Sequence, residues 1–356
     1  MILHVIPTLS SGGAEKMLVD IVREMQNQGV DCEVAVLTPS HDFFGQEIVK
    51  LGIPVFYGPT SKVYSVKNIL FLKRIIEKNK YDCIHTHLFA PQLFTPIALK
   101  LARISIPLVT TEHNTHNKRR DSKKFYWLDN WLYHQYDKII AISADTKVNL
   151  RSYLNNTGPK IEVIANGINI IQYAESQPTE RTQLCESLGK DEKIVLMVAA
   201  MREQKDHETL IRASKILPQE YRIIFVGEGE RMEEVQNYAR ENGSSSILFL
   251  GRRSDIPSIM KASDVFVLSS KWEGFGLVVV EAAASGLPVV ASDVDGLKEV
   301  VRTIGGQVFE PFNEHDLAKK IISSLESENV ELDVSKYTIQ ETVSKYLKVY
   351  KDIIKE

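Results

Sequence analysis

Short apolar runs alternate with amphipathic segments along the first half of the chain. Runs that favour strands lie at residues 2–6, 32–37, 82–87, 108–111, 138–142 and 161–164. Segments with a helical spacing of apolar positions lie between them, at residues 14–28, 68–79, 91–103, 122–135 and 145–154. Short buried strands separated by amphipathic helices predict a parallel sheet covered by helices on both faces.

A second series of the same kind follows the polar segment 166–192. Its strand-like runs lie at residues 194–199, 222–226, 247–250, 264–268 and 289–291. A chain of 356 residues exceeds a comfortable single core. We therefore expect an α/β fold with two doubly wound domains, 1–168 and 169–337, joined through the polar segment. A ligand is expected in the cleft between the carboxyl ends of their strands.

The stretch WEGFGLVVVEAAASGLP, residues 272–288, directly follows one of these strands. The glycines of EGFG allow a tight turn, the run AAA favours a helix, and the following GLP ends it. The run VVV at 278–280 favours a strand instead. We expect a buried helix that begins near Phe275 and ends near Gly286.

Two carboxylates in this stretch are candidates for ligand binding. Glu273 lies in the turn, and Glu281 follows eight positions later. The first amides of the helix would point at the carboxyl edge of the sheet, where an anion such as a diphosphate binds. Glu281 can accept hydrogen bonds from two vicinal hydroxyls, as the acidic residue does for ribose in dinucleotide folds.

Other candidates follow strands at the same kind of edge. The loop Ser10-Ser11-Gly12-Gly13 joins the first strand to the first helix, so its amides suit an anion, although a tight turn with a serine cap is the simpler interpretation. Lys205 precedes a helix after the strand 194–199, and its ammonium can reach a diphosphate.

Histidines suggest a second kind of site. His113 closes the strand 108–111, whereas a lone histidine is more often structural or exposed. His85, His87, His113 and His116 together raise the alternative of a zinc site, because His-x-His on a strand points both rings to one face. No cysteine or nearby carboxylate completes such a set, so we expect no metal.

Two further patterns are weak. Gly227-Glu228-Gly229 follows a strand, but Met232 stands where a dinucleotide motif needs its third glycine. Asp293-Val294-Asp295 has the form of a metal-binding DxD motif, which we interpret as a chance match.

Residues 118–131 combine cations with aromatic side chains. Lys118, Arg119, Arg120, Lys123 and Lys124 lead into Phe125, Tyr126, Trp127 and Trp131. Most charge runs are solvated faces, and aromatics usually pack inside. Cations beside tryptophan and tyrosine also suit an anionic membrane surface, and we expect peripheral contact there.

The stretch 272–288 closely resembles the E-x7-E motif of the retaining GT-B-fold glycosyltransferases, in particular the large fourth family. The resemblance extends over nearly the whole chain, through GGAEK at 12–16, TEH at 111–113, IANGIN at 164–169, REQKDHETLI at 202–211, VGEGE at 226–230 and GLKEVV at 296–301. It implies the GT-B architecture, with a last helix at about 338–356 that packs back on the N-terminal domain.

The resemblance also implies roles for individual residues. It implies that His113, Glu273 and Lys205 are catalytic. It also implies that Gly12, Gly13 and His113 lie on the acceptor side. The residues that it implies for donor binding are Gly13, Arg202, Lys205, Gly227, Arg253, Glu273, Gly274, Phe275, Gly276, Leu277 and Glu281. Family members usually carry an arginine five positions before the lysine. Ala200 stands there in this chain, so Arg202 either replaces that arginine or faces solvent.

The composition of the chain limits its expected binding partners and its location. The net charge is −3, which shows no bias toward nucleic acid. No apolar run is long enough to span a membrane and no signal peptide is evident, so a cytoplasmic location is expected. Cys32, Cys83 and Cys185 are far apart, which favours reduced thiols.

The expected function is that of a metal-independent, retaining hexosyltransferase in polysaccharide biosynthesis, without a cofactor. Its donor would be a nucleotide diphosphate sugar, with UDP favoured over GDP, and its acceptor a lipid-linked bacterial glycan. Two alternatives remain open at this stage: a nucleotide-sugar 2-epimerase of the same architecture, and a catalytically silent partner subunit.

Overall fold

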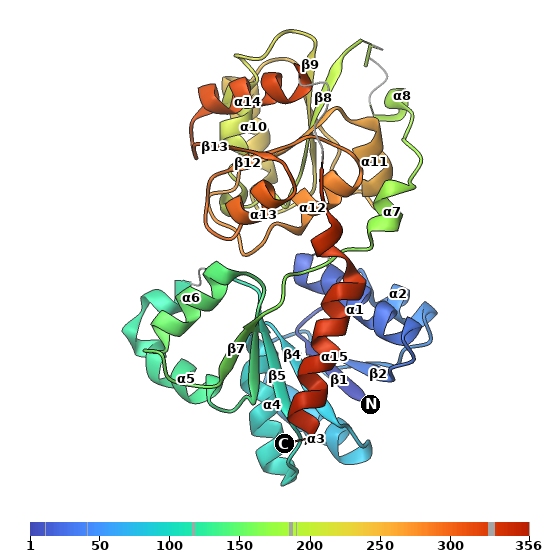
Figure 1. The fold of residues 1–356 in the computed structure, drawn as a ribbon, viewed down its shortest axis with the longest axis vertical. Helices are drawn as coiled ribbons and strands as arrows, with labels where there is room; N and C mark the ends of the chain where they lie inside the picture. The colour runs from blue at the N-terminus through green and yellow to red at the C-terminus, as the bar shows by residue number, and fades with distance from the viewer. Residues whose placement is uncertain are drawn as a thin grey trace. The chain divides into compact units, whose positions relative to one another are not determined.

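The computed structural model describes residues 1–10, 12–40, 42–115, 118–184, 188–189, 191–326 and 332–355. They form two compact units, Met1–Ile168 with Tyr337–Glu356, and Asn169–Lys336. In each unit a parallel sheet is flanked by helices, which confirms the predicted fold class (Figure 1).

The first unit contains a seven-stranded sheet of order β3-β2-β1-β4-β5-β6-β7. Its strands are β1 (Ile2–Ile6), β2 (Cys32–Val36), β3 (Val55–Tyr57), β4 (Cys83–His87), β5 (Leu108–Glu112), β6 (Lys138–Ala141) and β7 (Lys160–Val163). Its helices are α1 (Gly13–Asn27), α2 (Gly45–Lys50), α3 (Lys67–Lys78), α4 (Phe89–Ala102), α5 (Lys123–Tyr133), α6 (Ala144–Tyr153) and α15 (Ile339–Lys355). All residues of β1, β4 and β5 are buried, as expected for strands with helices on both faces.

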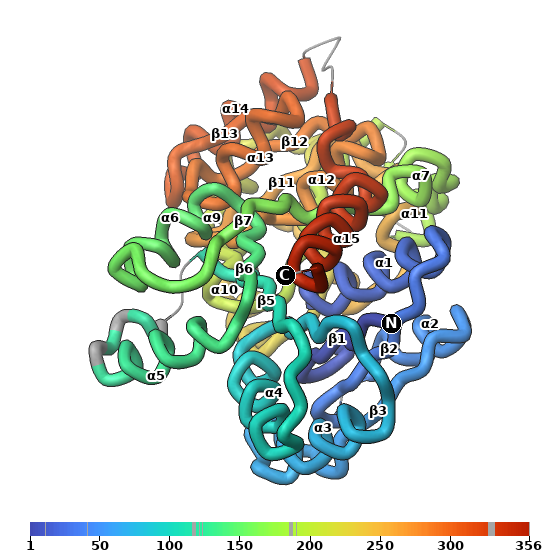
Figure 2. The backbone as a smooth tube through the Cα atoms, turned by 60° about the horizontal axis from the view of Figure 1, so that its bottom comes forward, coloured from blue at the N-terminus to red at the C-terminus, as the bar shows by residue number. Residues whose placement is uncertain are grey.

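Helix α15 returns the end of the chain to this unit. It lies beside α1 in Figure 2, and the structure places these two helices in contact. Tyr346 and Tyr350 of α15 are buried against the sheet. Backbone hydrogen bonds from Ile168 N to Tyr337 O at 2.8 Å and from Ile339 N to Ile168 O at 2.9 Å fix the start of the helix.

The second unit contains a six-stranded sheet of order β10-β9-β8-β11-β12-β13. Its strands are β8 (Lys193–Val198), β9 (Tyr221–Val226), β10 (Ile247–Phe249), β11 (Val265–Leu268), β12 (Val289–Ser292) and β13 (Gln307–Phe309). Its helices are α7 (Ile170–Ala174), α8 (Arg181–Leu184), α9 (His207–Ala213), α10 (Met232–Asn242), α11 (Ile256–Ala262), α12 (Leu277–Ala284), α13 (Lys298–Thr303) and α14 (Glu314–Glu326).

Part of the predicted connection belongs to the second unit. Residues 166–192 read as a polar linker, but α7 packs against α11 and α12 within this unit. Tyr173 and Leu184 are buried there. A few apolar anchors in a polar segment are enough to dock short helices, and this signal is too sparse to show as periodicity.

Besides α7 and α8, the short elements β3, β13 and α2 were not predicted from the sequence. Strands β3 and β13 are edge strands of three residues each, and most of their side chains are only half-buried. An edge strand of this length lacks both the continuous apolar run and the alternation by which strands are recognised.

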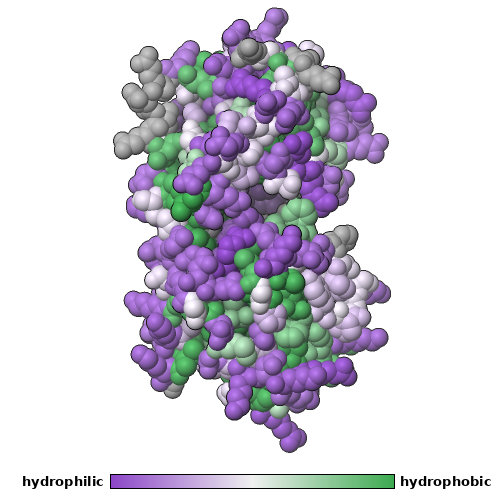
Figure 3. Space-filling model, turned by 90° about the vertical axis from the view of Figure 1, so that its right-hand side faces the viewer, coloured by the Kyte–Doolittle hydropathy of each residue, from purple (hydrophilic) through white to green (hydrophobic). Residues whose placement is uncertain are grey.

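Among the described helices, none is both long enough and apolar enough to cross a membrane. On the face drawn in Figure 3, hydrophilic side chains cover much of the surface of each unit, interspersed with apolar ones. Such scattered apolar residues are normal on a folded protein surface.

Gly227 offers a test of the packing in the second unit. It follows β9 with φ +140°, and a Cβ atom there would lie 2.0 Å from the carbonyl oxygen of Ala199. We expect Gly227→Ala to lower the free energy of unfolding of this unit by about 3 kcal/mol, through backbone strain and overpacking. Gly13→Ala, whose Cβ would meet nothing within 4 Å, should change the free energy of unfolding of the first unit by less than about 0.5 kcal/mol.

Urea denaturation followed by tryptophan fluorescence measures both effects. With Trp127 and Trp131 of the first unit replaced by Phe, Trp272 reports on Gly227→Ala in the second unit. With Trp272 replaced by Phe instead, Trp127 and Trp131 report on Gly13→Ala in the first unit. Equal midpoints for Gly227→Ala and its parent protein would contradict the close approach of the two backbone segments.

Candidate functional site

The strand order of the second sheet reverses between β8 and β11. Strands β9 and β10 lie on one side of β8, and β11, β12 and β13 lie on the other. The loops that leave the carboxyl ends of β8 and β11 therefore run to opposite sides, which opens a crevice at this edge. Lys205 follows β8 and Glu273 follows β11. Ligands of open α/β sheets bind at such a reversal point.

Glu273 and Lys205 form an ion pair at this point. Lys205 Nζ contacts Oε1 of Glu273, and Ser270 Oγ donates to the same oxygen at 2.8 Å. Gln204 Nε2 reaches the second oxygen, Oε2, at 3.5 Å. The carboxylate is buried, so solvent screens the pair little. Protein donors therefore occupy Oε1, whereas Oε2 keeps acceptor capacity for a hydroxyl group.

The two loops that carry this pair are tied together through the backbone. Lys271 N donates to Gln204 O at 2.8 Å, and Gln204 Nε2 donates to Trp272 O at 2.9 Å. Ser269 Oγ donates to Asp206 O at 2.7 Å. These bonds hold the lysine loop and the glutamate loop in register, so the ion pair is part of a rigid edge.

The stretch after Glu273 forms the buried helix α12, although its valines favour a strand. Val279 and Val280 are fully buried, so packing against neighbouring elements overrides their strand preference. Gly286 adopts φ +83° after the helix, and its N–H donates to Ala283 O at 2.9 Å. The N–H of Leu287 donates to Ala282 O at 3.0 Å, which completes a Schellman C-cap.

The N-terminus of α12 lies at the same sheet edge as the ion pair. The helix begins at Leu277, two residues after the predicted start, with Gly276 as its N-cap at φ +78°. The turn Gly274-Phe275-Gly276 connects it to Glu273, and Phe275 is buried. Glu281 lies in the second turn and is half-buried. The geometry thus places helix amides and two carboxylates within one strand–turn–helix segment.

Three other predicted donor residues have different surroundings. Gly227 lies where the backbone passes close to Ala199 O, which only glycine allows. Arg202 has a side chain that is 62% exposed, and its Nε lies 3.8 Å from Glu230. Arg253 makes a bidentate pair with Asp255, at 2.8 and 2.6 Å. The guanidinium of Arg202 thus faces Glu230 and that of Arg253 faces Asp255, and only the backbone of Arg202 contacts Lys205, whose N–H donates to Arg202 O at 3.0 Å.

The first sheet reverses its order between β1 and β4, and the loop after β1 leaves from this point. Gly12 is the N-cap of α1, and Gly13 is the first residue of that helix. Ser11 lies outside the described residues. Glu15 in the first helical turn accepts hydrogen bonds from the Thr8 and Ser10 hydroxyls, at 3.1 and 3.0 Å. The carboxylate of Glu15 therefore orders this loop from within.

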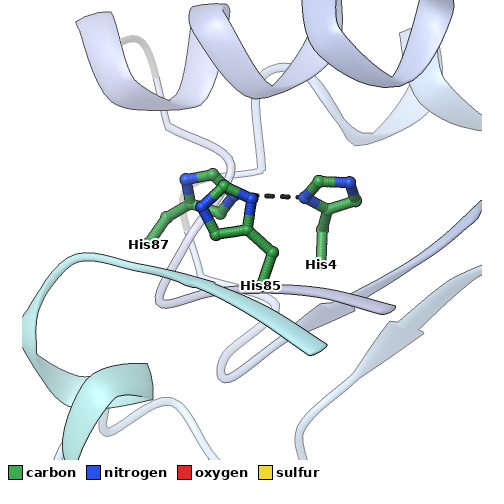
Figure 4. Close-up of side chains that lie close together, drawn as sticks. All are labelled: His4, His85 and His87. Atoms are coloured by element: carbon green, nitrogen blue, oxygen red, sulfur yellow. Dashed lines mark hydrogen bonds between the residues drawn. The ribbon is translucent and has the colours of Figure 1, made fainter. Parts of the chain in front are cut away.

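His113 directly follows β5 and contacts a group of buried histidines. His4 and His85 are register partners on β1 and β4, so their side chains lie on the same face of the sheet, and His87 follows two residues later (Figure 4). The ring of His113 lies 5.6 Å from that of His87. Burial lowers the pKa of His4 to about 3, and burial, opposed by Glu112, lowers that of His113 to about 4.

The histidines that lie close enough together to hold a zinc ion are not the four that were predicted. The structure brings His4, His85 and His87 together, with one ligand atom of each within 4.8 Å of the others. His116 lies outside the described residues. His4 bonds His87, and the four remaining ring nitrogens of the three residues bond Met25, His113, Tyr350 and Thr111. Hydrogen bonds within the protein thus satisfy all six nitrogens, and the cluster needs no ion to be stable.

The cations of the basic and aromatic segment 118–131 are not all exposed, contrary to the prediction. Arg120 is only 8% exposed and pairs with Glu112 at 2.6 Å, and Arg119 pairs with Asp129 at 3.0 Å. Both arginines therefore point inward, where buried carboxylates neutralise them, and the expectation of five outward cations was wrong for these two. The side chains of Lys118 and Lys123 lie outside the described ones, and Lys124 is exposed.

Helix α5 instead presents an apolar exposed surface. Its exposed large side chains are Phe125, Trp127, Leu128 and Trp131. Trp127 is 77% exposed. Lys100 Nζ of α4 lies 4.9 Å from the centre of the Trp131 ring, so a cation borders this surface.

Sequence reasoning missed several residues of these sites. Ser270 and Gln204 orient Glu273, and their positions beside Glu273 and Lys205 in the sequence were the available signal. His4 was missed because its partners lie about 80 positions away in the chain. The position of His4 could have been found by pairing the strand 2–6 with the strand 82–87, which carries His85 and His87, as neighbours in the sheet.

The chain matches two family models, Glycosyltransferase Family 4 over residues 11–172 and Glycosyl transferases group 1 over residues 180–341. It is 30% identical over 273 residues to the Escherichia coli UDP-Gal:alpha-D-GlcNAc-diphosphoundecaprenol alpha-1,3-galactosyltransferase, which covers 72% of this chain and 70% of that protein. It is 28% identical over 353 residues to the Campylobacter jejuni N,N'-diacetylbacillosaminyl-diphospho-undecaprenol alpha-1,3-N-acetylgalactosaminyltransferase, which covers 91% and 92%.

Solved structures agree with the fold. The crystal structure of Anabaena HepE in complex with UDP-glucose matches with a TM-score of 0.80 at 24% identity, over 99% of this chain and 98% of that chain. The architecture is therefore GT-B, as the sequence predicted. The chain belongs to the group 1, family 4 glycosyltransferases, and its activity is glycosyl transfer.

The buried histidines predict acid sensitivity of the first unit. The folded-state pKa of His4 is about 3, below the ordinary 6.5, so between these values the unfolded chain binds more protons than the folded one. Stability therefore falls as the pH drops below 6.5, by about 1.4 kcal/mol per pH unit for such a histidine. We expect His4→Leu to make the loss of stability between pH 6 and pH 5 smaller by about this amount.

Urea denaturation at pH 7, 6 and 5 measures this slope. His315→Gln, at an exposed position, is the matched control and should keep the slope of the unsubstituted protein. A His4→Leu protein with an unchanged slope would show that His4 is not held neutral in the folded state.

Proposed function

We propose that this glycosyltransferase moves a hexose from a UDP-sugar to a hydroxyl of a lipid-linked bacterial glycan. The ion pair of Glu273 with Lys205 at the reversal point of the second sheet carries the proposal, because it presents one available carboxylate oxygen beside a helix N-terminus. The E. coli and C. jejuni relatives act on diphosphoundecaprenol-linked sugars, and the HepE structure contains UDP-glucose. These names support the donor and acceptor classes.

Each part of the donor has a candidate partner in the second unit. Glu281 would accept hydrogen bonds from the ribose hydroxyls, and Oε2 of Glu273 would accept one from a sugar hydroxyl. Lys205 and the first amides of α12 would face the diphosphate, where negative charge increases as the bond to the sugar breaks. Arg202 and Arg253 are peripheral candidates, since one is exposed and the other is paired with Asp255.

The proposed reaction retains the configuration at the anomeric carbon. The bond between that carbon and the diphosphate oxygen breaks, and the acceptor oxygen bonds the same face of the sugar. The acceptor proton moves to the leaving phosphate oxygen, so the products are UDP and a glycoside. Fixed amides and the lysine stabilise the leaving group, and this chemistry needs no metal or cofactor.

Turnover assays with single UDP-sugars test this function. The purified protein should release UDP slowly by hydrolysis, and faster when a lipid-linked acceptor is present. Release of a 2-epimerised nucleotide sugar, or no reaction with any UDP-sugar or GDP-sugar, would favour the epimerase or the silent subunit instead.

Two glutamate variants separate the proposed roles. Glu281→Gln should weaken UDP binding by about 1.5 to 3 kcal/mol, because an amide replaces one of the two oxygens that face the ribose hydroxyls. Glu273→Gln should leave UDP affinity nearly unchanged and lower turnover, because its partner is the sugar. Calorimetry with UDP and kinetics with UDP-sugar measure both, and equal loss of UDP affinity in the two variants would refute this division.

We also propose that the enzyme contacts the cytoplasmic face of the membrane through α5. The exposed aromatic side chains of this helix would enter the interface between headgroups and acyl chains, and Lys124 and Lys100 would face anionic headgroups. Because Arg119 and Arg120 are paired with Asp129 and Glu112, we expect apolar contact to contribute more to membrane binding than charge does.

Vesicle co-sedimentation tests this contact. Trp127→Ser with Trp131→Ser should lower binding to anionic vesicles by about tenfold, through loss of buried apolar area. Lys124→Ser should have a smaller effect. Tyr64→Ser with Val66→Ser removes a similar exposed apolar area elsewhere in the unit and should bind normally. Unchanged pelleting of the tryptophan variant would exclude α5 as the contact.

A further inference from the structure

A single residue, Asp206, connects the loop that carries Lys205 to the helix that follows it. The 3₁₀ turn Glu203–Lys205 ends at this residue, and α9 begins directly after it. Asp206 adopts φ +46° and ψ +55°, the left-handed conformation, in which the chain reverses its direction. The direction of the Lys205 side chain therefore depends on the backbone of its neighbour.

The carboxylate of Asp206 does not act as a helix cap. A capping aspartate has an extended backbone and accepts a hydrogen bond from an amide of the first helical turn. The backbone of Asp206 is left-handed, and its side chain accepts from no amide of α9, a helix that the structure describes throughout. Oδ2 accepts instead from the Thr209 hydroxyl at 2.6 Å, and Arg212 Nη2 donates to that hydroxyl at 3.1 Å. The carboxylate is thus anchored to side chains of α9.

The backbone of Asp206 is anchored to the neighbouring strand as well. Ser269 Oγ lies 2.7 Å from Asp206 O and 3.2 Å from Lys205 O. A hydroxyl has one hydrogen, so its main bond is the shorter one, to Asp206 O. Ser269 directly follows β11 and is buried. This bond fixes the reversal to the end of the strand, and with it the base of the Lys205 side chain.

The conformation is one that most residues avoid. Asparagine and aspartate enter the left-handed region more easily than other residues that carry a side chain, and glycine enters it freely. Asp206 is buried, and burial raises the pKa of its carboxyl. A carboxylate is thus kept where burial disfavours its charge. Backbone conformations of this kind persist where surrounding contacts hold them, and they collect at functional sites.

We propose that Asp206 is a positioning residue, whose left-handed backbone, held by Thr209 and Ser269, directs the Lys205 ammonium toward Glu273. The contact of Lys205 Nζ with Oε1 of Glu273 is the result in this structure. In the proposed function, on which this step rests, the same backbone sets the ammonium in place for the leaving diphosphate before the donor binds, so the reaction requires less reorganisation. Asp206 thus acts through Lys205.

Substitutions of Asp206 separate its backbone from its carboxylate. Asp206→Asn keeps the left-handed preference and an acceptor for Thr209, and Asp206→Gly keeps the left-handed backbone alone. Both should retain kcat/KM for the UDP-sugar within about threefold. Asp206→Ala removes the carboxylate as Asp206→Gly does but resists the left-handed region, so kcat/KM should fall about tenfold.

Asn156→Ala is the matched control for these kinetics. Asn156 is an exposed residue of the first unit with φ +58°, so this substitution strains a left-handed backbone away from Lys205 and should keep the parent rate. An Asp206→Ala protein as fast as the parent would remove the positioning role. An Asp206→Gly protein as slow as Asp206→Ala, with both folded by circular dichroism, would assign the effect to the carboxylate and overturn the proposal equally.

Chemical labelling tests the position of Lys205 without any substrate. Acetylation by N-hydroxysuccinimidyl acetate, followed by peptide mass spectrometry, measures the reactivity of each amine, with the exposed Lys124 as the internal reference. Lys205 is paired and its side chain is 18% exposed, so it should react slowly in the parent and in Asp206→Gly. It should react about threefold faster in Asp206→Ala, where the ion pair is weakened.

Equal acetylation of Lys205 in the parent, Asp206→Gly and Asp206→Ala would contradict the proposed direction of its side chain. Because this measurement needs no donor, it remains decisive even where no UDP-sugar is turned over and the proposed function itself fails.

Discussion

The reversal of strand order in each parallel sheet is the constraint on which the site depends. In the second unit β8 and β11 are neighbours whose loops leave in opposite directions, so Lys205 and Glu273 meet although they are 68 positions apart. In the first unit the same reversal between β1 and β4 brings His4 beside His85 and His87. The chemistry of both edges follows from a topology that short apolar strands and amphipathic helices specify.

The buried pair of Glu273 and Lys205 is better understood as a means of orientation than as a source of stability. Taking two charges from water costs much of what their attraction returns. Ser270, Gln204 and the backbone bonds between the loops hold the carboxylate so that one oxygen is occupied by protein donors. In the proposed function, this arrangement would present a hydroxyl acceptor beside a cation before the donor binds, which would lower the reorganisation required during the reaction.

Sequence patterns were sufficient to predict the longer sheet strands, α12 and the glycosyltransferase family, because burial and turn chemistry act locally. They were insufficient for β3 and β13, whose three residues carry no period, and for His4, whose meaning depends on a strand paired far along the chain. Arg119 and Arg120 read as a surface charge run, but Asp129 and Glu112, which are distant in sequence or hidden in a strand, turn them inward. Contacts of this kind exist only once the fold is formed.

The configuration of the product tests the central claim most directly. Proton resonance of the anomeric hydrogen, recorded early in a reaction with an α-linked UDP-sugar and an acceptor in the presence of a metal chelator, reports both stereochemistry and metal dependence. A family 4 enzyme that uses Glu273, Lys205 and the α12 amides as proposed should form the α-glycoside at an undiminished rate. A β-glycoside, or loss of the reaction on chelation, would contradict this account.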